Sequence, residues 1–250
     1  MILRINGLKF CYKSVPVLEN ISFDVVEGEV LTILGRNGAG KTTLLKCLNH
    51  ILSPQVGTVQ IDGIDTKNMS PVEIARKMGW VPQLGDKSKM KVYDFILLGR
   101  KPYFRWNPTK DDYRKVEESI RVLGIEDISL RYVDELSGGE FQLVQIVRAL
   151  AQDPRVILLD EPTSSLDIRN QHRLMAKMNQ IIHGCPRAAV MTMHDINLAL
   201  RYSDKFLLLK EGCICAFGDR NIVTPEKIQE VYDMQVRVVE AGGYPLVIPI

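Results

Sequence analysis

Short apolar runs of strand length alternate with amphipathic stretches of helix length through most of this chain. The apolar runs have the length of strands buried on both faces, and they are VLTIL (30–34), VILLD (156–160), AAVMTM (188–193) and KFLLLK (205–210). Helix-patterned segments lie between them: KTTLLKCLNHIL, Ile168–Ile182 and Ile196–Tyr202. This alternation predicts an α/β fold whose central sheet is largely parallel.

The first 29 residues have a different pattern. LRINGLKF and ISFDVV alternate apolar and polar residues, as strands with one solvated face do, and they predict an antiparallel sheet at the edge of the fold. TVQIDG predicts a further strand, and GWVPQ predicts a short strand that ends at Gln83. The segment SPVEIARK predicts a helix that Ser70 caps and in which Pro71 is the first residue.

From about Leu84 to Gln152 the pattern becomes helical. VYDFILLGR, DDYRKVEESIRVLG and GEFQLVQIVRALAQ predict three helices, with Gly99 and Gly124 at the C-terminal ends of the first two. We therefore expect one domain: a nucleotide-binding core formed by residues 1–84 and 153–219, an inserted helical lobe at 85–152, and a tail of one helix and two strands at 220–250.

Composition excludes several classes of protein. Of 250 residues, 46% are hydrophobic, and the formal charge of +2 lacks the basic surplus of nucleic-acid-binding proteins. No apolar run approaches the roughly 20 residues of a spanning helix, and no signal peptide is recognisable, so we expect a cytoplasmic protein that reaches the membrane through a partner. The five cysteines suit reduced thiols; Cys213 and Cys215 lack further metal ligands nearby.

The clearest chemical motif is a phosphate-binding loop. GRNGAGKTT fits the pattern G-x-x-x-x-G-K-[ST] and lies between the strand VLTIL and a helix. Its backbone amides and the helix N-terminus attract phosphate; Lys41 would reach the β- and γ-phosphates of ATP, and Thr42 would bind Mg²⁺. The alternative is a glycine-rich turn without a ligand. The predicted nucleotide-binding residues of the loop are Gly35, Arg36, Asn37, Gly38, Ala39, Gly40, Lys41, Thr42 and Thr43.

Two carboxylates follow the second buried strand. Asp160 fits the acidic residue that acts on Mg²⁺ in phosphate-loop ATPases, and Glu161 is placed to polarise an attacking water as a general base. By itself an Asp-Glu pair is as easily a solvated strand end. Beside the phosphate loop, the catalytic interpretation is favoured.

The segment LSGGE (136–140) resembles the signature motif of ATP-binding cassette (ABC) ATPases. Physically it is a serine and two glycines that open a helix, hence a second anion site, although Ser-Gly-Gly is also an ordinary helix start. The phosphate loop and this segment fall on different lobes, so one chain cannot aim both at one γ-phosphate. In the family the signature completes the site across a head-to-tail homodimer, which implies ATP contacts for Ser137, Gly138, Gly139 and Glu140.

The resemblance covers essentially the whole chain and implies further site residues. Tyr12 lies where an aromatic residue stacks on adenine, and Gln83 matches the glutamine that contacts Mg²⁺ and the attacking water. Asp167, in SSLD, matches the loop that touches the second subunit, and His194 matches the switch histidine at the γ-phosphate. Alone, a tyrosine such as Tyr12 after a strand is more often a packing residue, and a histidine such as His194 at a strand end is usually structural. The chain departs from the family at Phe141, Leu143 and Ser165, which puts packing at the dimer or transporter face in doubt.

Less specific stretches resemble the ATPase subunits of importers for iron–siderophores, haem or vitamin B12. They are MSPVEIARKMGWVPQ, VYDFILLGRKPYFRW, LDIRNQ, HDINLALRYSDKFLLLKEG and GGYPLVIPI. This likeness implies a peripheral protein at the cytoplasmic face of the membrane, membrane permease subunits whose coupling helix docks on residues 84–105, and indirectly an extracytoplasmic substrate-binding protein. The alternatives are another ABC transporter, a soluble cassette ATPase acting on nucleic acid or ribosomes, and a phosphate-loop kinase.

Overall fold

The computed structural model describes all 250 residues and contains a six-stranded central sheet. The strand order is β10-β9-β3-β8-β7-β6. Five neighbouring strands are parallel and only β10 is antiparallel to β9, so the predicted α/β fold with a largely parallel sheet is confirmed. The strands are β3 (Val30–Leu34), β6 (Met78–Val81), β7 (Val156–Asp160), β8 (Ala188–Thr192), β9 (Lys205–Lys210) and β10 (Cys213–Gly218).

A four-stranded antiparallel sheet, in the order β2-β1-β4-β5, lies beside the central sheet, as the alternating pattern of the first residues predicts. Buried and exposed residues alternate along much of β1, which is what a sheet with one covered face requires. The strands are β1 (Leu3–Tyr12), β2 (Val15–Val25), β4 (Val56–Ile61) and β5 (Ile64–Asp65).

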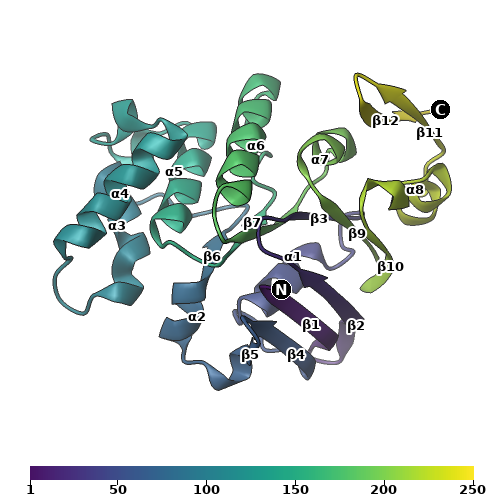
Figure 1. Ribbon diagram of the computed structural model, residues 1–250, viewed down its shortest axis with the longest axis horizontal. Helices are drawn as coiled ribbons and strands as arrows, with labels where there is room; N and C mark the ends of the chain where they lie inside the picture. The colour runs from purple at the N-terminus through teal and green to yellow at the C-terminus, as the bar shows by residue number, and fades with distance from the viewer.

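Every element between β6 and β7 is helical, and together these elements form a lobe at one end of the molecule (Figure 1). Helices α6 and α7 cover one face of the central sheet, whereas α1 lies on the side of the antiparallel sheet (Figure 1). The α-helices are α1 (Lys41–Leu48), α2 (Pro71–Lys77), α3 (Val92–Leu97), α4 (Lys110–Leu123), α5 (Gly138–Ala151), α6 (Ile168–His183), α7 (Ile196–Tyr202) and α8 (Pro225–Tyr232).

The shorter elements complete the lobe and the tail. They are the 3₁₀ turns η1 (Thr66–Asn68), η2 (Leu98–Tyr103), η3 (Glu126–Ile128), η4 (Val133–Glu135) and η5 (Arg220–Ile222), and the antiparallel hairpin of β11 (Val236–Ala241) and β12 (Tyr244–Pro249). The hairpin and α8 lie at the end of the molecule opposite the helical lobe (Figure 1). No helix in the structure is both long enough and apolar enough to cross a membrane.

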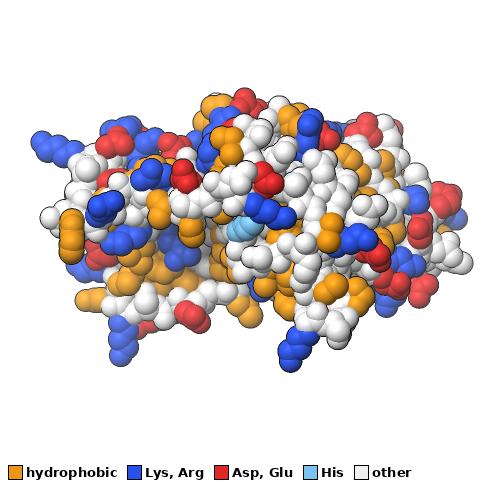
Figure 2. All heavy atoms as spheres, turned by 90° about the horizontal axis from the view of Figure 1, so that it is seen from below, with side chains coloured by type: hydrophobic (Ala, Val, Ile, Leu, Met, Phe, Trp, Pro, Cys, Tyr) orange, Lys and Arg blue, Asp and Glu red, His pale blue; other side chains and the backbone are white.

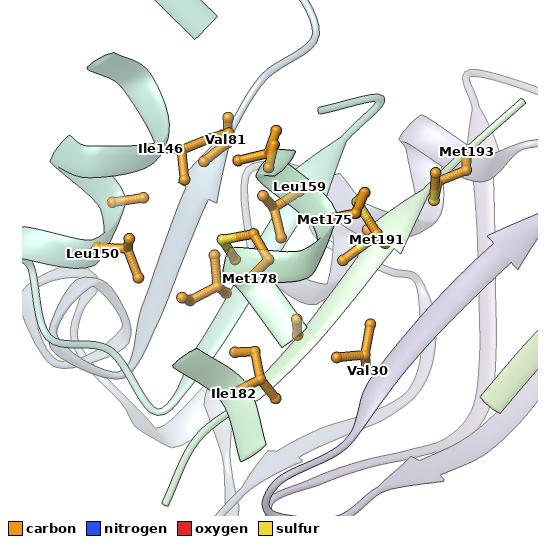
Figure 3. Close-up of a cluster of buried hydrophobic side chains, with 14 of the residues drawn as sticks. Val30, Val81, Ile146, Leu150, Leu159, Met175, Met178, Ile182, Met191 and Met193 are labelled. Atoms are coloured by element: carbon orange, nitrogen blue, oxygen red, sulfur yellow. The ribbon is translucent and has the colours of Figure 1, made fainter. Parts of the chain in front are cut away.

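The central sheet separates two hydrophobic cores. Leu31 and Ile33 of β3 pack with α1 and the antiparallel sheet, in a cluster of 25 buried residues. Val30 and Leu34, on the other face of the same strand, belong to a cluster of 38 that joins α6, α7 and the helical lobe. Figure 3 shows part of this second cluster, where Met178 and Ile182 lie beside Val30 and Met191. Each such side chain contributes about 1.5–3 kcal/mol on burial, so both layers fix the edge of the sheet that carries the site.

Several predicted element ends are confirmed by their capping geometry. Ser70 and Glu73 form a reciprocal capping box at the start of α2, with Pro71 as its first residue. Gly124 adopts a left-handed conformation at the end of α4, as predicted.

Three predicted ends are wrong. Helix α1 stops at Leu48, although the apolar pattern continues to Leu52, because His50 adopts a left-handed φ of +54°. Strand β6 ends at Val81, before Gln83.

Helix α3 ends at Leu97, before Gly99, and the chain continues as the 3₁₀ turn η2. A Cβ atom on Gly99 would lie 2.3 Å from the Arg148 carbonyl oxygen, so this glycine permits close approach to α5 rather than capping α3. The neighbouring Arg100 is buried, and its Nε donates to Asp112 at 2.9 Å, which fixes η2 against α4.

Candidate active site

A cavity of about 360 Å³ opens at the carboxyl ends of the parallel strands, the usual position for ligands in open α/β sheets. Its walls come from the β3–α1 loop and from residues that follow β6, β7 and β8. Nine of the predicted site residues line it, together with Val17: Asn37, Gly38, Gly40, Lys41, Thr42, Thr43, Gln83, Glu161 and His194. Val17 belongs to β2, and no sequence signal singles it out from other apolar strand residues.

The β3–α1 loop has the backbone of a phosphate cradle. Gly38 and Gly40 take φ values of +82° and +100°, which side chains disfavour. Gly35 is needed for a different reason: a Cβ atom there would lie 2.3 Å from the Leu209 carbonyl oxygen. The loop ends at the N-terminus of α1, where free amides and the helix dipole favour an anion.

Lys41 is folded into the loop, with only 6% of the residue exposed. Its ammonium donates to the carbonyl oxygens of Gly35 at 2.7 Å and Arg36 at 3.1 Å. Burial lowers the pKa of Lys41, while Glu161 and Asp160 act in the opposite direction by favouring the cation. The positive charge is therefore kept close to the cavity at a cost in solvation that a bound polyphosphate would offset.

Oxygen atoms of Thr42 and Asp160 meet at the end of β7. Thr42 Oγ1 donates to Asp160 Oδ1 at 3.1 Å, and Thr192 Oγ1 donates to the same oxygen at 2.7 Å. Asp160 is only 2% exposed, so these bonds fix the direction of its carboxylate. Hydroxyl and carboxylate oxygens are ligands that suit Mg²⁺. Thr192 is not among the site residues predicted from the sequence. The feature that could have indicated it is a hydroxyl at the end of an otherwise apolar strand.

Glu161 connects two other site residues. Gln83 Nε2 lies 2.5 Å from Glu161 Oε2, and His194 Nε2 contacts the other carboxylate oxygen, Oε1. The Glu161 backbone has a φ of +50°, which is rare for a residue with a side chain, and its amide donates to Thr192 Oγ1 at 2.9 Å. Such a conformation persists because surrounding bonds hold it, and it is typical of functional sites.

The signature segment lies outside this cavity. Ser137 caps α5, accepting from the Glu140 amide at 3.3 Å, while its own amide donates to Glu140 Oε2 at 2.8 Å. This bonding lowers the pKa of Glu140. Gly138 and Gly139 pack against the loop before α6: a Cβ atom on Gly139 would lie 3.0 Å from Leu166 Cδ2. The four residues 137–140 thus form a helix start separate from the phosphate cradle.

The departures from the signature pattern have a packing explanation at one position. Phe141 is buried against Phe95 on α3, with ring centroids 5.8 Å apart, where a polar side chain would lose its hydration. Asp167 caps α6, accepting from the Asn170 amide at 2.8 Å, and does not line the cavity.

Four predicted nucleotide contacts also lie outside the cavity lining. Tyr12 is 45% exposed and packs edge-on against Phe10, with centroids 4.8 Å apart. The Arg36 guanidinium lies 3.6 Å from the Asp233 carboxylate of the tail, and Gly35 and Ala39 belong to the loop without lining the cavity.

A larger hollow, of about 680 Å³, lies between the core and the helical lobe. Its walls come from α2, η2 and α5 and from the segment after α1, including Met69, Ala75, Trp80, Leu98 and Pro102. Figure 2 shows hydrophobic side chains gathered beside Lys and Arg on the face seen from below. Only the 98–102 part of the predicted 84–105 surface lines this groove.

The fold and the first cavity define a phosphate-loop ATPase: a phosphate cradle, a buried lysine, an acidic strand end and a second carboxylate held over the same space. The chain matches the ABC transporter family over residues 18–164 and belongs to it. It is an ATP-binding, ATP-hydrolysing subunit of an ABC transporter.

Two relatives extend along nearly the whole chain. An uncharacterized ABC transporter ATP-binding protein of Methanocaldococcus jannaschii is 48% identical over 250 residues, covering 100% of this chain and 98% of the relative. The ferric enterobactin transport ATP-binding protein of Escherichia coli is 33% identical over 256 residues, covering 99% of this chain and 94% of the relative.

Two solved structures are also similar. An ABC transporter assigned to the metal-chelate type, in an inward-facing conformation, gives a TM-score of 0.86 at 28% identity, covering 100% of this chain and 97% of that one. A dimeric ATP-binding cassette in a post-hydrolysis state, bound to ADP and Pi, gives a TM-score of 0.78 at 27% identity. The match covers 87% of this chain and 98% of that one. ABC cassettes of this fold therefore form dimers.

Proposed function

We propose that this chain energises uptake of a metal chelate, of the iron–siderophore, haem or cobalamin type, through membrane permease subunits. The observation that carries the proposal is the similarity, over the full chain, to the ATPase of a metal-chelate type transporter. The likeness to a ferric enterobactin transport protein supports the same substrate class. The chain would act at the cytoplasmic face of the membrane.

ATP is held, in this proposal, between two copies of the chain. The phosphate loop of one copy and residues 137–140 of the other bind the same triphosphate. Tyr12 stacks on the adenine, and Asp167 contacts the second subunit. The separation of Ser137 from the phosphate cavity within one chain supports a site that a second copy completes. Contacts made only with nucleotide present would shift the population toward the closed dimer.

Hydrolysis would depend on the carboxylate of Glu161. Placed at the cavity by Gln83 and His194, it accepts the proton of the attacking water, a step typically worth 10²–10⁴-fold in rate. His194 and Lys41 hold the γ-phosphate. Thr42, Asp160 and Gln83 offer the oxygen donors that suit Mg²⁺, which when bound would neutralise charge on the β- and γ-phosphates.

The larger groove would receive the permease. It has apolar walls with basic residues beside them, the mixture expected where a short helix docks. It lies between the core (1–84 and 153–219) and the helical lobe (85–152), so a movement of the lobe would reach the membrane subunit. The tail (220–250) completes the single domain, and an extracytoplasmic substrate-binding protein would act on the far side of the membrane.

Purification from native membranes tests this function. The tagged Glu161→Gln chain, trapped with ATP, should retain a membrane permease; reconstituted with that permease, the wild-type chain should hydrolyse ATP faster when a ferric siderophore, haem or cobalamin is supplied with its binding protein. Ala75→Arg, in the groove, should lose the permease, whereas Val72→Arg, on the exposed part of α2, should keep it. A complex stimulated only by substrates that are not metal chelates would contradict the proposal.

A further inference from the structure

The C-terminal tail touches the start of the phosphate loop. Helix α8 is anchored by Ile228 and Val231, which are buried in the larger core, and it ends at Tyr232 with Asp233 as its cap. The Asp233 carboxylate lies 3.6 Å from the guanidinium of Arg36. The residue before it, Tyr232, lies near enough to Gly35 for the Gly35 backbone to influence the pKa of its hydroxyl.

The Tyr232 hydroxyl is buried and has no hydrogen-bond partner of good geometry within the protein. Burial raises the pKa of Tyr232 to about 12, and the backbone amide of Gly35 is close enough to act in the opposite direction. The amide is thus near the hydroxyl but outside the geometry of a formed hydrogen bond. A buried hydroxyl without a partner is unfavourable, so a small movement of the loop that pairs it would be favoured.

The same two loop residues hold the catalytic lysine. Gly35 and Arg36 provide the carbonyl oxygens that accept from Lys41 Nζ, at 2.7 Å and 3.1 Å. A shift of this dipeptide therefore changes where the ammonium sits. Asp233 pairs with the Arg36 side chain, and Lys41 binds the two backbone carbonyl oxygens of the dipeptide.

The tail is also tied to the segment that carries His194. The Asn197 side chain makes two hydrogen bonds with the backbone of Val247 in β12, Nδ2 to the carbonyl at 3.1 Å and Oδ1 from the amide at 2.8 Å. Asn197 lies on α7, whose N-cap, Asp195, directly follows His194. The tail therefore spans the two loops, around Gly35 and His194, that face the same cavity.

We propose that Tyr232 and Asp233 are positioning residues for the phosphate loop: Tyr232 pairs with the Gly35 amide when ATP is bound, Asp233 restrains Arg36, and the tail thereby sets the affinity for ATP. The chemical step depends on Glu161 and is unaffected. Because the contact lies within one chain, this inference holds whether or not the transported substrate is a metal chelate.

The test is Tyr232→Phe in the full chain, which removes the hydroxyl and keeps the ring. The Kd and KM for ATP should rise roughly three- to tenfold, the range expected for one lost hydrogen bond, with kcat unchanged. Asp233→Asn should have a smaller effect that disappears in about 1 M salt, where screening acts over roughly 3 Å. Tyr113→Phe, on α4 in the helical lobe, is the matched control and should leave both constants unchanged.

Two results would overturn the proposal. If Tyr232→Phe leaves Kd and KM within about twofold of wild type, the hydroxyl does not position the loop. If it lowers the melting temperature or kcat while ATP affinity is kept, Tyr232 is a packing residue only. Loss of folding is not expected, because the substitution removes a buried hydroxyl that has no partner.

Discussion

Gln83 Nε2 and Glu161 Oε2 are 2.5 Å apart, although the two residues follow different strands of the central sheet. Adjacent parallel strands β6 and β7 bring them together, and the His194 ring closes on the other carboxylate oxygen from the end of β8. The carboxylate is thus held over the phosphate cradle from both sides. Rearrangement at either partner would change where it points, which makes Gln83 and His194 suited to report the state of the γ-phosphate.

Replacement of Glu161 by Gln should lower ATP hydrolysis by on the order of 10² or more, because an amide cannot take the proton of the attacking water. The Gln side chain keeps the shape of the site, so ATP should stay bound and a stable dimer should accumulate. Phosphate release and size-exclusion chromatography measure the two effects. Turnover close to that of the wild type would remove Glu161 from the catalytic step.

The pKa of Lys41 predicts a pH dependence of ATP binding. Burial lowers this pKa in the free protein, whereas bound phosphates would raise it. As pH rises through the lowered pKa, the free protein loses the cation and must take up a proton to bind ATP, so affinity should fall.

Titration with ATP over an alkaline series that ends at the ordinary lysine pKa of 10.5 measures the effect. Lys41→Arg is the control: its guanidinium stays charged, so its weaker binding should be flat over this range. A flat profile for the wild type would show that Lys41 does not bind the phosphates as a cation.

Burial of Lys41 also makes folding pH-dependent. Because its pKa is lower in the folded chain than in the unfolded one, the unfolded chain binds more protons between these two values. The contribution of Lys41 to stability should therefore rise with pH in that alkaline window.

Much of the active site could be predicted because its chemistry is local in sequence. The loop GRNGAGKTT and the strand end VILLDE carry their residue types at fixed spacing, and the buried strands around them are recognisable by composition alone. Element ends were less predictable where tertiary contacts decide them. The apolar pattern of α1 continues past Leu48, and only the left-handed φ of His50 ends the helix.

Contacts between distant segments were not predictable. Nothing near Tyr232 or Asp233 in the sequence indicates a phosphate loop, and the two are brought to Gly35 and Arg36 only by the packing of α8. Similarly, Thr192 becomes a support for Asp160 only because β7 and β8 are neighbours in register.

Lys87 links the segment after Gln83 to the signature helix. Its ammonium contacts the Leu136 carbonyl, one residue before Ser137, and lies 5.8 Å from the centre of the Phe141 ring. Lys87→Met should keep ATP binding by the single chain but reduce ATP-driven dimer formation and hydrolysis, since Ser137 loses a restraint. Lys89→Met, two residues away, should behave as the wild type. Equal dimer formation by both variants would exclude this restraint.

The ion pair of Arg100 and Asp112 should dominate the stability of the helical lobe. Both side chains are about 95% buried or more, and Arg100 also donates to the carbonyl oxygen of Ala151 at 3.0 Å. Arg100→Met should cost about 3–5 kcal/mol in the free energy of unfolding, because Asp112 is left buried without its partner. Urea denaturation measures this.

Arg114→Met removes two exposed ion pairs, with Asp111 and Glu118, on the same helix as Asp112 and should leave the urea midpoint unchanged. Equal effects of the two substitutions would mean that the buried pair is not the source of stability.

The shared site can be tested by mixing two inactive variants. Lys41→Ala removes the phosphate loop's cation, and Ser137→Arg fills the signature helix start. In a head-to-tail dimer, a mixed pair regains one intact site, so an equal mixture should recover about a quarter of wild-type ATP hydrolysis if pairing is random and the sites are independent. If Lys41 and Ser137 acted within one chain, both sites of every mixed dimer would be defective, and hydrolysis by the mixture would stay at the level of either variant alone.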